Sequence, residues 1–198
     1  MTYYTLSDPC AATLEIKKSQ FLGFGIAIDS REQLMFHVEQ LRNQYPDARH
    51  VCYGYIIGDP HNTTSAGFDD DGEPSGTAGR PILNVLQHKG IGNCVVIVVR
   101  YFGGIKLGAG GLTRAYSSTA QAVVDNMNLH AFVPLSVILI ETDFANESFV
   151  RHTFDGFKAK ILKVDYGKNV VLTVELAQKS VQALSEKIGF YGTVKASE

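Results

Sequence analysis

The stretch CVVIVVRYFGGIKLGAGGLTRAY, residues 94–116, decides the fold of the first part of the chain. Its first six residues, 94–99, are apolar and nearly all β-branched, which is typical of a buried central strand. A glycine-rich loop over 103–111 follows, and residues from about 112 to 127 predict a helix. The stretch is therefore expected to run from a buried strand through a tight loop into a helix.

The residues before this stretch predict more strands and helices around it. Strands are expected at 14–16, 21–28 and 50–57. Ser30 and Gln33 fit a capping box ahead of apolar residues at helical spacing, so a helix is expected to begin there and to end before Pro46. A second helix is expected at about 77–87. Residues 58–76 contain several glycines and prolines with little hydrophobic periodicity and are expected to form a long loop, which is often functional.

After an expected linker at 128–134, the pattern becomes β-α-β-β-α-β. The predicted elements lie at 135–142, 146–157, 159–165, 169–176, 179–189 and 192–195. This order is the ferredoxin-like arrangement. The sequence therefore predicts two α+β domains, residues 1–130 and 131–198.

Composition narrows the classes of function. Of 198 residues, 45% are hydrophobic, and the net charge is −2, so any nucleic-acid binding must come from a local basic patch. Three widely spaced cysteines argue against a disulfide framework or a structural zinc site. Neither a signal peptide nor an apolar run of about 20 residues is present, so we expect a cytoplasmic protein without membrane contact.

The stretch GFDDDGEPSGTAGRP, residues 67–81, is an acidic loop. We take as possible functional residues its polar members Asp70, Asp71, Glu73, Ser75 and Thr77. In a simpler interpretation, the acids solvate the loop and favour the N-terminus of the next helix, with Ser75 or Thr77 as its cap. The spacing does not fit a calcium loop.

The loop after the central strand is glycine-rich and basic. Helix N-termini present unpaired N–H groups and a partial positive charge, and glycines let a ligand approach that backbone. The candidate nucleic-acid- or anion-binding residues are Arg100, Lys106, Gly108, Gly110, Gly111 and Arg114. In the alternative, these glycines only allow the backbone to pack against a neighbouring strand. The loop matches neither a Walker A motif nor a clean dinucleotide fingerprint.

No catalytic residue, metal ligand set or cofactor is predicted. His50 and Cys52 lie two apart on a strand and share a face. A Cys/His nucleophile pair would also need an orienting group and an oxyanion site, and the sequence shows a signature for neither.

The motifs DDGEPSGTAGRP (70–81) and VVRYFGGIKLGAGGLTRAY (98–116), with EIKKSQF (15–21) and Ala48-Arg49-His50-x-Cys52 upstream, resemble the IMPACT family and its bacterial YigZ-like members. The resemblance spans roughly residues 13–127, and Gln20 stands where arginine is frequent. It implies that the first domain shares the fold of the second domain of a small-subunit ribosomal protein and of domain four of the translocation elongation factor. The second domain would resemble that factor's last domain.

Both of these relatives touch ribosomal RNA, and the eukaryotic family members act in translational control. They carry a different extra domain, so their role towards a starvation-sensing kinase is not transferred here. The resemblance implies a non-catalytic RNA- or ribosome-associated protein, with Arg100, Lys106 and Arg114 exposed around one concavity. Two alternatives stay open: a metal-assisted hydrolase or phosphoryl-transfer enzyme using Asp70, Asp71 or Glu73, and a protein–protein interaction module. The sequence does not predict the oligomeric state.

Overall fold

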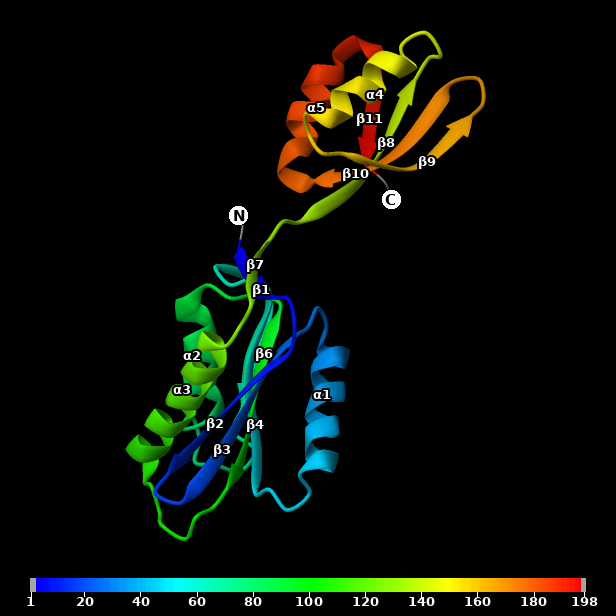
Figure 1. Cartoon of the computed structure of the whole chain (residues 1–198). Coiled ribbons are helices and arrows are strands. Elements are labelled where there is room, and N and C mark those ends of the chain that lie inside the picture. The colour runs from blue at the N-terminus through cyan, green and yellow to red at the C-terminus, as the bar shows by residue number, and fades with distance from the viewer. Residues whose placement is uncertain (1–2, 197–198) are drawn as a thin grey trace. The chain divides into compact units, whose positions relative to one another are not determined.

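A computed structural model describes residues 3–196 of the chain (Figure 1). The chain divides into two compact units, Met1–Phe132 and Val133–Glu198. Each described unit combines antiparallel sheet with helices, which confirms the expected α+β class.

The first unit is built on a five-stranded sheet in the order β2-β3-β6-β4-β5, in which all neighbours are antiparallel. Its strands are β2 (Cys10–Ile16), β3 (Ser19–Ala27), β4 (His50–Asp59), β5 (Asn62–Asp69) and β6 (Cys94–Tyr101). The apolar strand β6 lies in the centre, as its sequence predicts. Tight backbone conformations at Lys17 (φ 48°) and Lys18 (φ 64°) turn β2 into β3.

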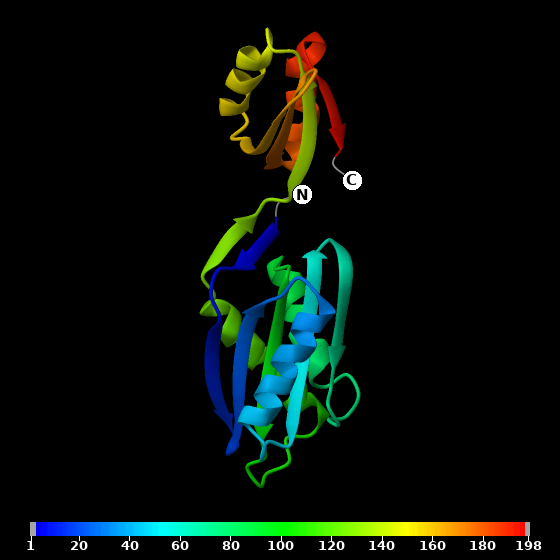
Figure 2. The ribbon, with the colours of Figure 1, turned by 90° about the vertical axis from the view of Figure 1, so that its right-hand side faces the viewer.

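Helices cover both faces of this sheet (Figures 1 and 2). Helix α1 (Arg31–Gln44) lies on one face, and α2 (Gly79–Lys89) and α3 (Ala109–Asp125) lie on the other. Val95, Ile97 and Val99 of β6 belong to the core under α1, whereas Val96 and Val98 belong to the core under α2 and α3. The strand is apolar on both faces because each face is covered.

The expected capping of α1 is confirmed. The Ser30 hydroxyl accepts a hydrogen bond from the Gln33 backbone N–H at 3.4 Å, and the Gln33 side chain accepts one from the Asp29 N–H at 3.0 Å. These bonds satisfy backbone donors that the first turn of a helix leaves unpaired.

Two predicted irregular segments are in fact partly strands. The predicted loop at 58–76 is wrong over Asn62–Asp69, which forms β5 and pairs with β4. This edge strand is mostly exposed, so it carries little hydrophobic periodicity. The predicted linker at 128–134 contains β7 (Leu129–Phe132), which pairs with β1 (Tyr3–Leu6), a strand that the sequence analysis missed. Each of these strands has only four residues, which is too short to show a clear periodicity.

The second unit contains six main elements and two short 3₁₀ helices. They are β8 (Leu135–Thr142), α4 (Glu147–Asp155), β9 (Lys160–Tyr166), β10 (Val170–Ala177), η1 (Gln178–Ser180), α5 (Val181–Ile188), η2 (Gly189–Tyr191) and β11 (Thr193–Ala196). The strands form a sheet in the order β11-β8-β10-β9. One core joins both helices to the sheet, and alternate β10 residues, such as Leu172 and Val174, are buried in it.

Candidate functional site

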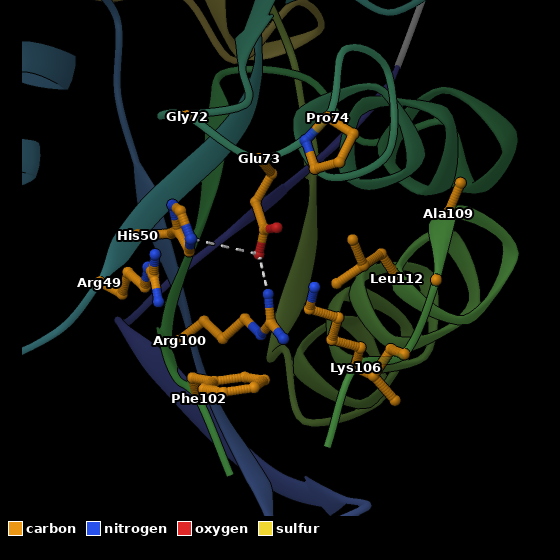
Figure 3. Close-up of a pocket in the computed structure, with 12 residues that line it drawn as sticks. Arg49, His50, Gly72, Glu73, Pro74, Arg100, Phe102, Lys106, Ala109 and Leu112 are labelled. Atoms are coloured by element: carbon orange, nitrogen blue, oxygen red, sulfur yellow. Dashed lines mark hydrogen bonds and ion pairs between the residues drawn. The ribbon is translucent and has the colours of Figure 1, made fainter. Parts of the chain in front are cut away.

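The acidic loop and the glycine-rich basic loop line one cavity of about 440 Å³ in the first unit (Figure 3). The acidic loop contributes Gly72, Glu73 and Pro74. The other lining residues come from around the start of β4, from the end of β6, from the basic loop and from the start of α3. They are Arg49, His50, Arg100, Phe102, Lys106, Leu107, Gly108, Ala109 and Leu112. Segments that are separate in the sequence therefore form a single site.

A buried ion pair joins the acidic loop to the end of β6 at the wall of this cavity. One oxygen of Glu73, Oε1, accepts from Arg100 Nη1 at 2.5 Å and from the Tyr116 hydroxyl at 2.8 Å. Arg100 is only 6% exposed and Glu73 8%. Arg100 reaches this place because even-numbered β6 residues face α2 and α3, and because its strand register sets it directly opposite His50. The acidic loop is thus held by charge to the strand that precedes the basic loop.

The Arg100 guanidinium still has an unused donor. Its Nε is buried and has no hydrogen-bond partner among the described residues. The guanidinium lies over the rings of Phe21 and Phe102, at 5.5 and 5.8 Å from their centroids, and these rings offer no acceptor atom. Leaving a buried donor unpaired costs free energy, so this N–H is an exception among the buried polar groups of the described residues.

His50 faces the same pair from the other side. Its Nδ1 lies 2.7 Å from the backbone carbonyl oxygen of Asp71. A carbonyl only accepts, so Nδ1 carries the hydrogen, and Nε2 of the neutral ring is left as an acceptor. This Nε2 lies 3.9 Å from Glu73 Oε1, at the cavity wall.

The N-terminus of α3 opens onto the cavity. Gly108 is its N-cap residue with φ 70°, and no side chain caps the helix. The first intrahelical bond runs from the Leu112 N–H to the Gly108 carbonyl, so the N–H groups of the first turn point towards the cavity end with their partial positive charge. The exposed Lys106 side chain extends towards the Arg100 guanidinium (Figure 3).

Asp70 of the acidic loop fits the simpler interpretation, in which the acids support the N-terminus of the next helix. Its Oδ1 accepts from the backbone N–H groups of Ala78 and Gly79, at 3.0 and 2.8 Å, and its Oδ2 accepts from that of Gly76 at 2.7 Å. These three bonds tie down the start of α2. The Asp70 carboxylate therefore accepts hydrogen bonds from the first amides of α2, as the side chain of an N-cap residue normally does.

The expectation that Ser75 or Thr77 caps α2 is wrong. The N-cap residue is Ala78, with no side-chain cap bond. The Thr77 hydroxyl donates instead to the Pro74 carbonyl at 2.6 Å, and Ser75 is exposed.

Asp71 is also engaged in structure. Its Oδ1 bonds to Arg42 Nη2 at 2.7 Å, and its Oδ2 accepts from the Val51 N–H at 2.6 Å. The carboxylates of Asp70, Asp71 and Glu73 thus each have separate partners. Within residues 3–196, no group of three or more His, Cys, Asp or Glu is arranged to hold a metal ion.

The expected single concavity around three exposed basic residues needs correction. Arg100 is buried, and Arg114 lines a separate hollow of about 230 Å³ together with Lys17 and Gly111. Of these three residues, Lys106 alone is exposed and lines the cavity.

Some glycines of the basic loop fit the interpretation that they allow close backbone packing, and others do not. A Cβ on Gly103 would come within 2.0 Å of the Lys18 backbone, so Gly103 permits close packing against the β2–β3 turn. A Cβ on Gly110 would meet nothing within 4 Å, and its φ is not positive. Packing therefore explains Gly103 but leaves Gly110 without a structural reason.

The buried thiol below the cavity is not a nucleophile in this environment. Cys52 Sγ donates to the Asp70 carbonyl at 3.0 Å and lies 3.4 Å from the Tyr116 hydroxyl. Burial raises the pKa of the Cys52 thiol well above its ordinary value, which disfavours the thiolate. Burial also raises the pKa of Tyr116, which keeps its hydroxyl a donor to Glu73.

Sequence reasoning missed Arg49 and Tyr116 as parts of the site. Arg49 precedes β4, and its backbone N–H donates to the Arg100 carbonyl at 3.2 Å. Tyr116 is fully buried on α3 and looks like a core residue in the pattern. Separately, none of the helices within 3–196 has the length and apolarity to cross a membrane.

Fold and site together define a two-unit α+β protein whose first unit carries a basic cavity between an acidic and a glycine-rich loop. Residues 17–124 match the Impact N-terminal domain family, and the chain belongs to the IMPACT family. It is 35% identical to IMPACT family member YigZ of Escherichia coli strain K12, over 91% of this chain and 88% of that protein. It is 29% identical to YvyE of Bacillus subtilis strain 168, over 93% and 84%.

A solved structure, described as that of a hypothetical protein, is similar over the whole chain. It covers 100% of this chain and 98% of its own, at 32% identity and a TM-score of 0.73. The two-unit architecture is therefore shared with an independent structure of related sequence.

Proposed function

We propose that the protein is a non-catalytic RNA- or ribosome-associated factor in translation regulation, and that its cavity contacts phosphate. One observation carries this proposal: an uncapped helix N-terminus, the Lys106 ammonium and an Arg100 guanidinium with an unused N–H all face one cavity. Each of these groups favours an anion, and phosphate is the anion that helix N-termini and arginine forks bind best.

The charges in the cavity support this proposal. The Glu73 carboxylate is offset by Arg100, which leaves Lys106 and Arg49 as uncompensated cations in the lining. The whole chain carries a net charge of −2, so long-range attraction to RNA is weak and binding would depend on this local site.

Family membership supports the link to translation, since eukaryotic members act in translational control. We extend the proposal to the fold: the first unit would share the fold of the second domain of a small-subunit ribosomal protein and of elongation-factor domain four. The second unit, with its sheet order β11-β8-β10-β9, would be ferredoxin-like. A cytoplasmic location follows from such a role.

The metal-assisted enzyme gains less support from the geometry. The acidic-loop carboxylates are bonded to backbone amides, to Arg42 or to Arg100 rather than converging on one point. No observation favours a hydrolytic site over a binding site.

Charge reversal at Lys106 tests the proposal. Lys106→Glu is compared with Lys168→Glu, a matched reversal of an exposed lysine in the second unit, in sedimentation with purified ribosomes and in filter binding to total RNA. We expect Lys106→Glu alone to weaken binding and to lower its salt dependence, because a lost phosphate contact lowers the slope of log affinity against log salt by about 1. Equal binding by both variants would overturn the proposal.

A further inference from the structure

We infer that the cavity binds one ribonucleoside 5′-phosphate with free 2′ and 3′ hydroxyls, either as the 3′ end of an RNA or as a free nucleotide. This inference rests on the proposed function and deepens it by naming the ligand class. The cavity combines a phosphate site, a pair of hydrogen-bond acceptors and an exposed aromatic ring, and a terminal ribonucleotide is a ligand that uses all three.

The phosphate site lies at the N-terminus of α3. This helix spans 17 residues, and its first turn has no side-chain cap. The second observation is independent of the helix: Arg100 lines the same cavity, its side chain is more than nine-tenths buried, and its Nε has no partner. A phosphate oxygen supplies the acceptor that the first-turn N–H groups lack, and the charge of the guanidinium in the cavity wall attracts it.

The acceptors lie opposite, on Glu73 and His50. Glu73 uses Oε1 for both of its bonds, so its second oxygen, Oε2, is left to accept. The Nε2 of His50 accepts whenever the ring carries a single hydrogen, because Nδ1 holds that hydrogen towards the Asp71 carbonyl. A bare phosphate has no use for these acceptors, whereas two neighbouring ribose hydroxyls are donors that match them. A carboxylate that holds a ribose hydroxyl is an established solution in nucleotide sites.

The third component is Phe102, which is 43% exposed and lines the cavity beside Arg100. Nucleobases stack on exposed aromatic rings largely without regard to sequence. The volume of about 440 Å³ falls in the ordinary range for small-molecule pockets. It suits one nucleotide, while a duplex is far too wide to enter.

The first test compares ligands. Titration calorimetry of the whole chain uses AMP, 2′-deoxy-AMP and inorganic phosphate, and filter binding uses a ten-residue RNA with either an ordinary or a 2′,3′-dideoxy 3′ end. Hydrogen bonds to charged groups contribute about 1.5–3 kcal/mol, so loss of a ribose hydroxyl should weaken binding about tenfold or more. A preference for AMP alone identifies a free nucleotide, and a preference for the ordinary RNA end identifies an RNA terminus.

The second test uses variants that leave the buried ion pair intact. Phe102→Ala should weaken the preferred ligand about fivefold or more, since stacking contributes about 1–3 kcal/mol. Phe68→Ala, a change of another phenylalanine that is 43% exposed in the same unit, should not.

The outcomes separate this inference from the proposed function. Ribosome or RNA binding that depends on Lys106 but treats ordinary and dideoxy ends alike overturns the inference and leaves the function standing. Ribose-selective binding of AMP without any binding of RNA or ribosomes supports the inference and contradicts the proposed function. Equal, weak binding of phosphate and both nucleotides overturns the inference.

Discussion

Breaking the Glu73–Arg100 pair should destabilise the first unit more than removing the pair as a whole. Glu73→Gln leaves the Arg100 charge buried without its counter-ion, and Arg100→Met leaves the Glu73 charge with only the Tyr116 hydroxyl. Breaking a buried pair costs about 3–5 kcal/mol, whereas replacing both partners by neutral groups is often nearly neutral. The pair borders an open cavity, so we take the lower end: about 3 kcal/mol for each single change. The double variant should cost less than either single change, which places it about 3 kcal/mol or more below the sum of the two singles.

Hydrogen exchange resolved by peptide, measured against urea, is the suitable assay, because the chain contains no tryptophan and has two units. Peptides from β6 report the first unit, and peptides from β10 serve as an internal reference that should not change. Arg42→Met, which removes a half-exposed partner of Asp71, is the control and should cost no more than about 1 kcal/mol. A coupling below about 0.5 kcal/mol between Glu73 and Arg100 would refute the reasoning.

Three further predictions concern stability. Asp70→Ala should lower the free energy of unfolding by about 2 kcal/mol, the upper end for a lost helix cap, because three backbone amides lose their acceptor. Amide hydrogen exchange at the start of α2 should become faster. Gly110→Ala should stabilise the protein by up to about 1 kcal/mol through helix propensity, whereas Gly103→Ala should destabilise it because its Cβ meets backbone, as thermal melting of the pair would show. The folded protein keeps Cys52 and Cys94 protonated because burial raises both pKa values. The unfolded thiols ionise near pH 8.5, so the free energy of unfolding should fall above that pH by up to about 1.4 kcal/mol per unit and per thiol, and urea unfolding of Cys52→Ala should show a shallower fall.

Elements with a clear local pattern could be predicted from the sequence, whereas β1, β5 and β7 could not. Strand β6 is buried on both faces and α1 carries a capping box, so each left a clear pattern. Strand β5 lies at the sheet edge with most residues exposed, so it carries little hydrophobic periodicity. Strands β1 and β7 have four residues each, and their pairing joins segments distant in the sequence, which hydrophobic periodicity does not report.

The site was predicted at the level of loops but not of side-chain roles. Both loops were identified, yet the pairing of Glu73 with Arg100 depends on the register that sets His50 opposite Arg100. Arg114 could have been separated from the cavity by helix geometry alone. It lies two residues, or about 200°, beyond Leu112 around the helix, and Leu112 is the residue that faces the cavity.

The pairing of β1 with β7 brings the two ends of the first unit side by side, with Tyr3 opposite Phe132. A folded unit whose two ends lie next to each other connects to the rest of a chain at a single place. Such a module can be inserted into a surface loop of another protein, or carried beside a different partner domain, without stretching its fold. The same pairing also protects the five-stranded sheet from mechanical load. A force that reaches the first unit through residue 133 acts first on the four residue pairs between β1 and β7, and only then on the sheet that holds the cavity.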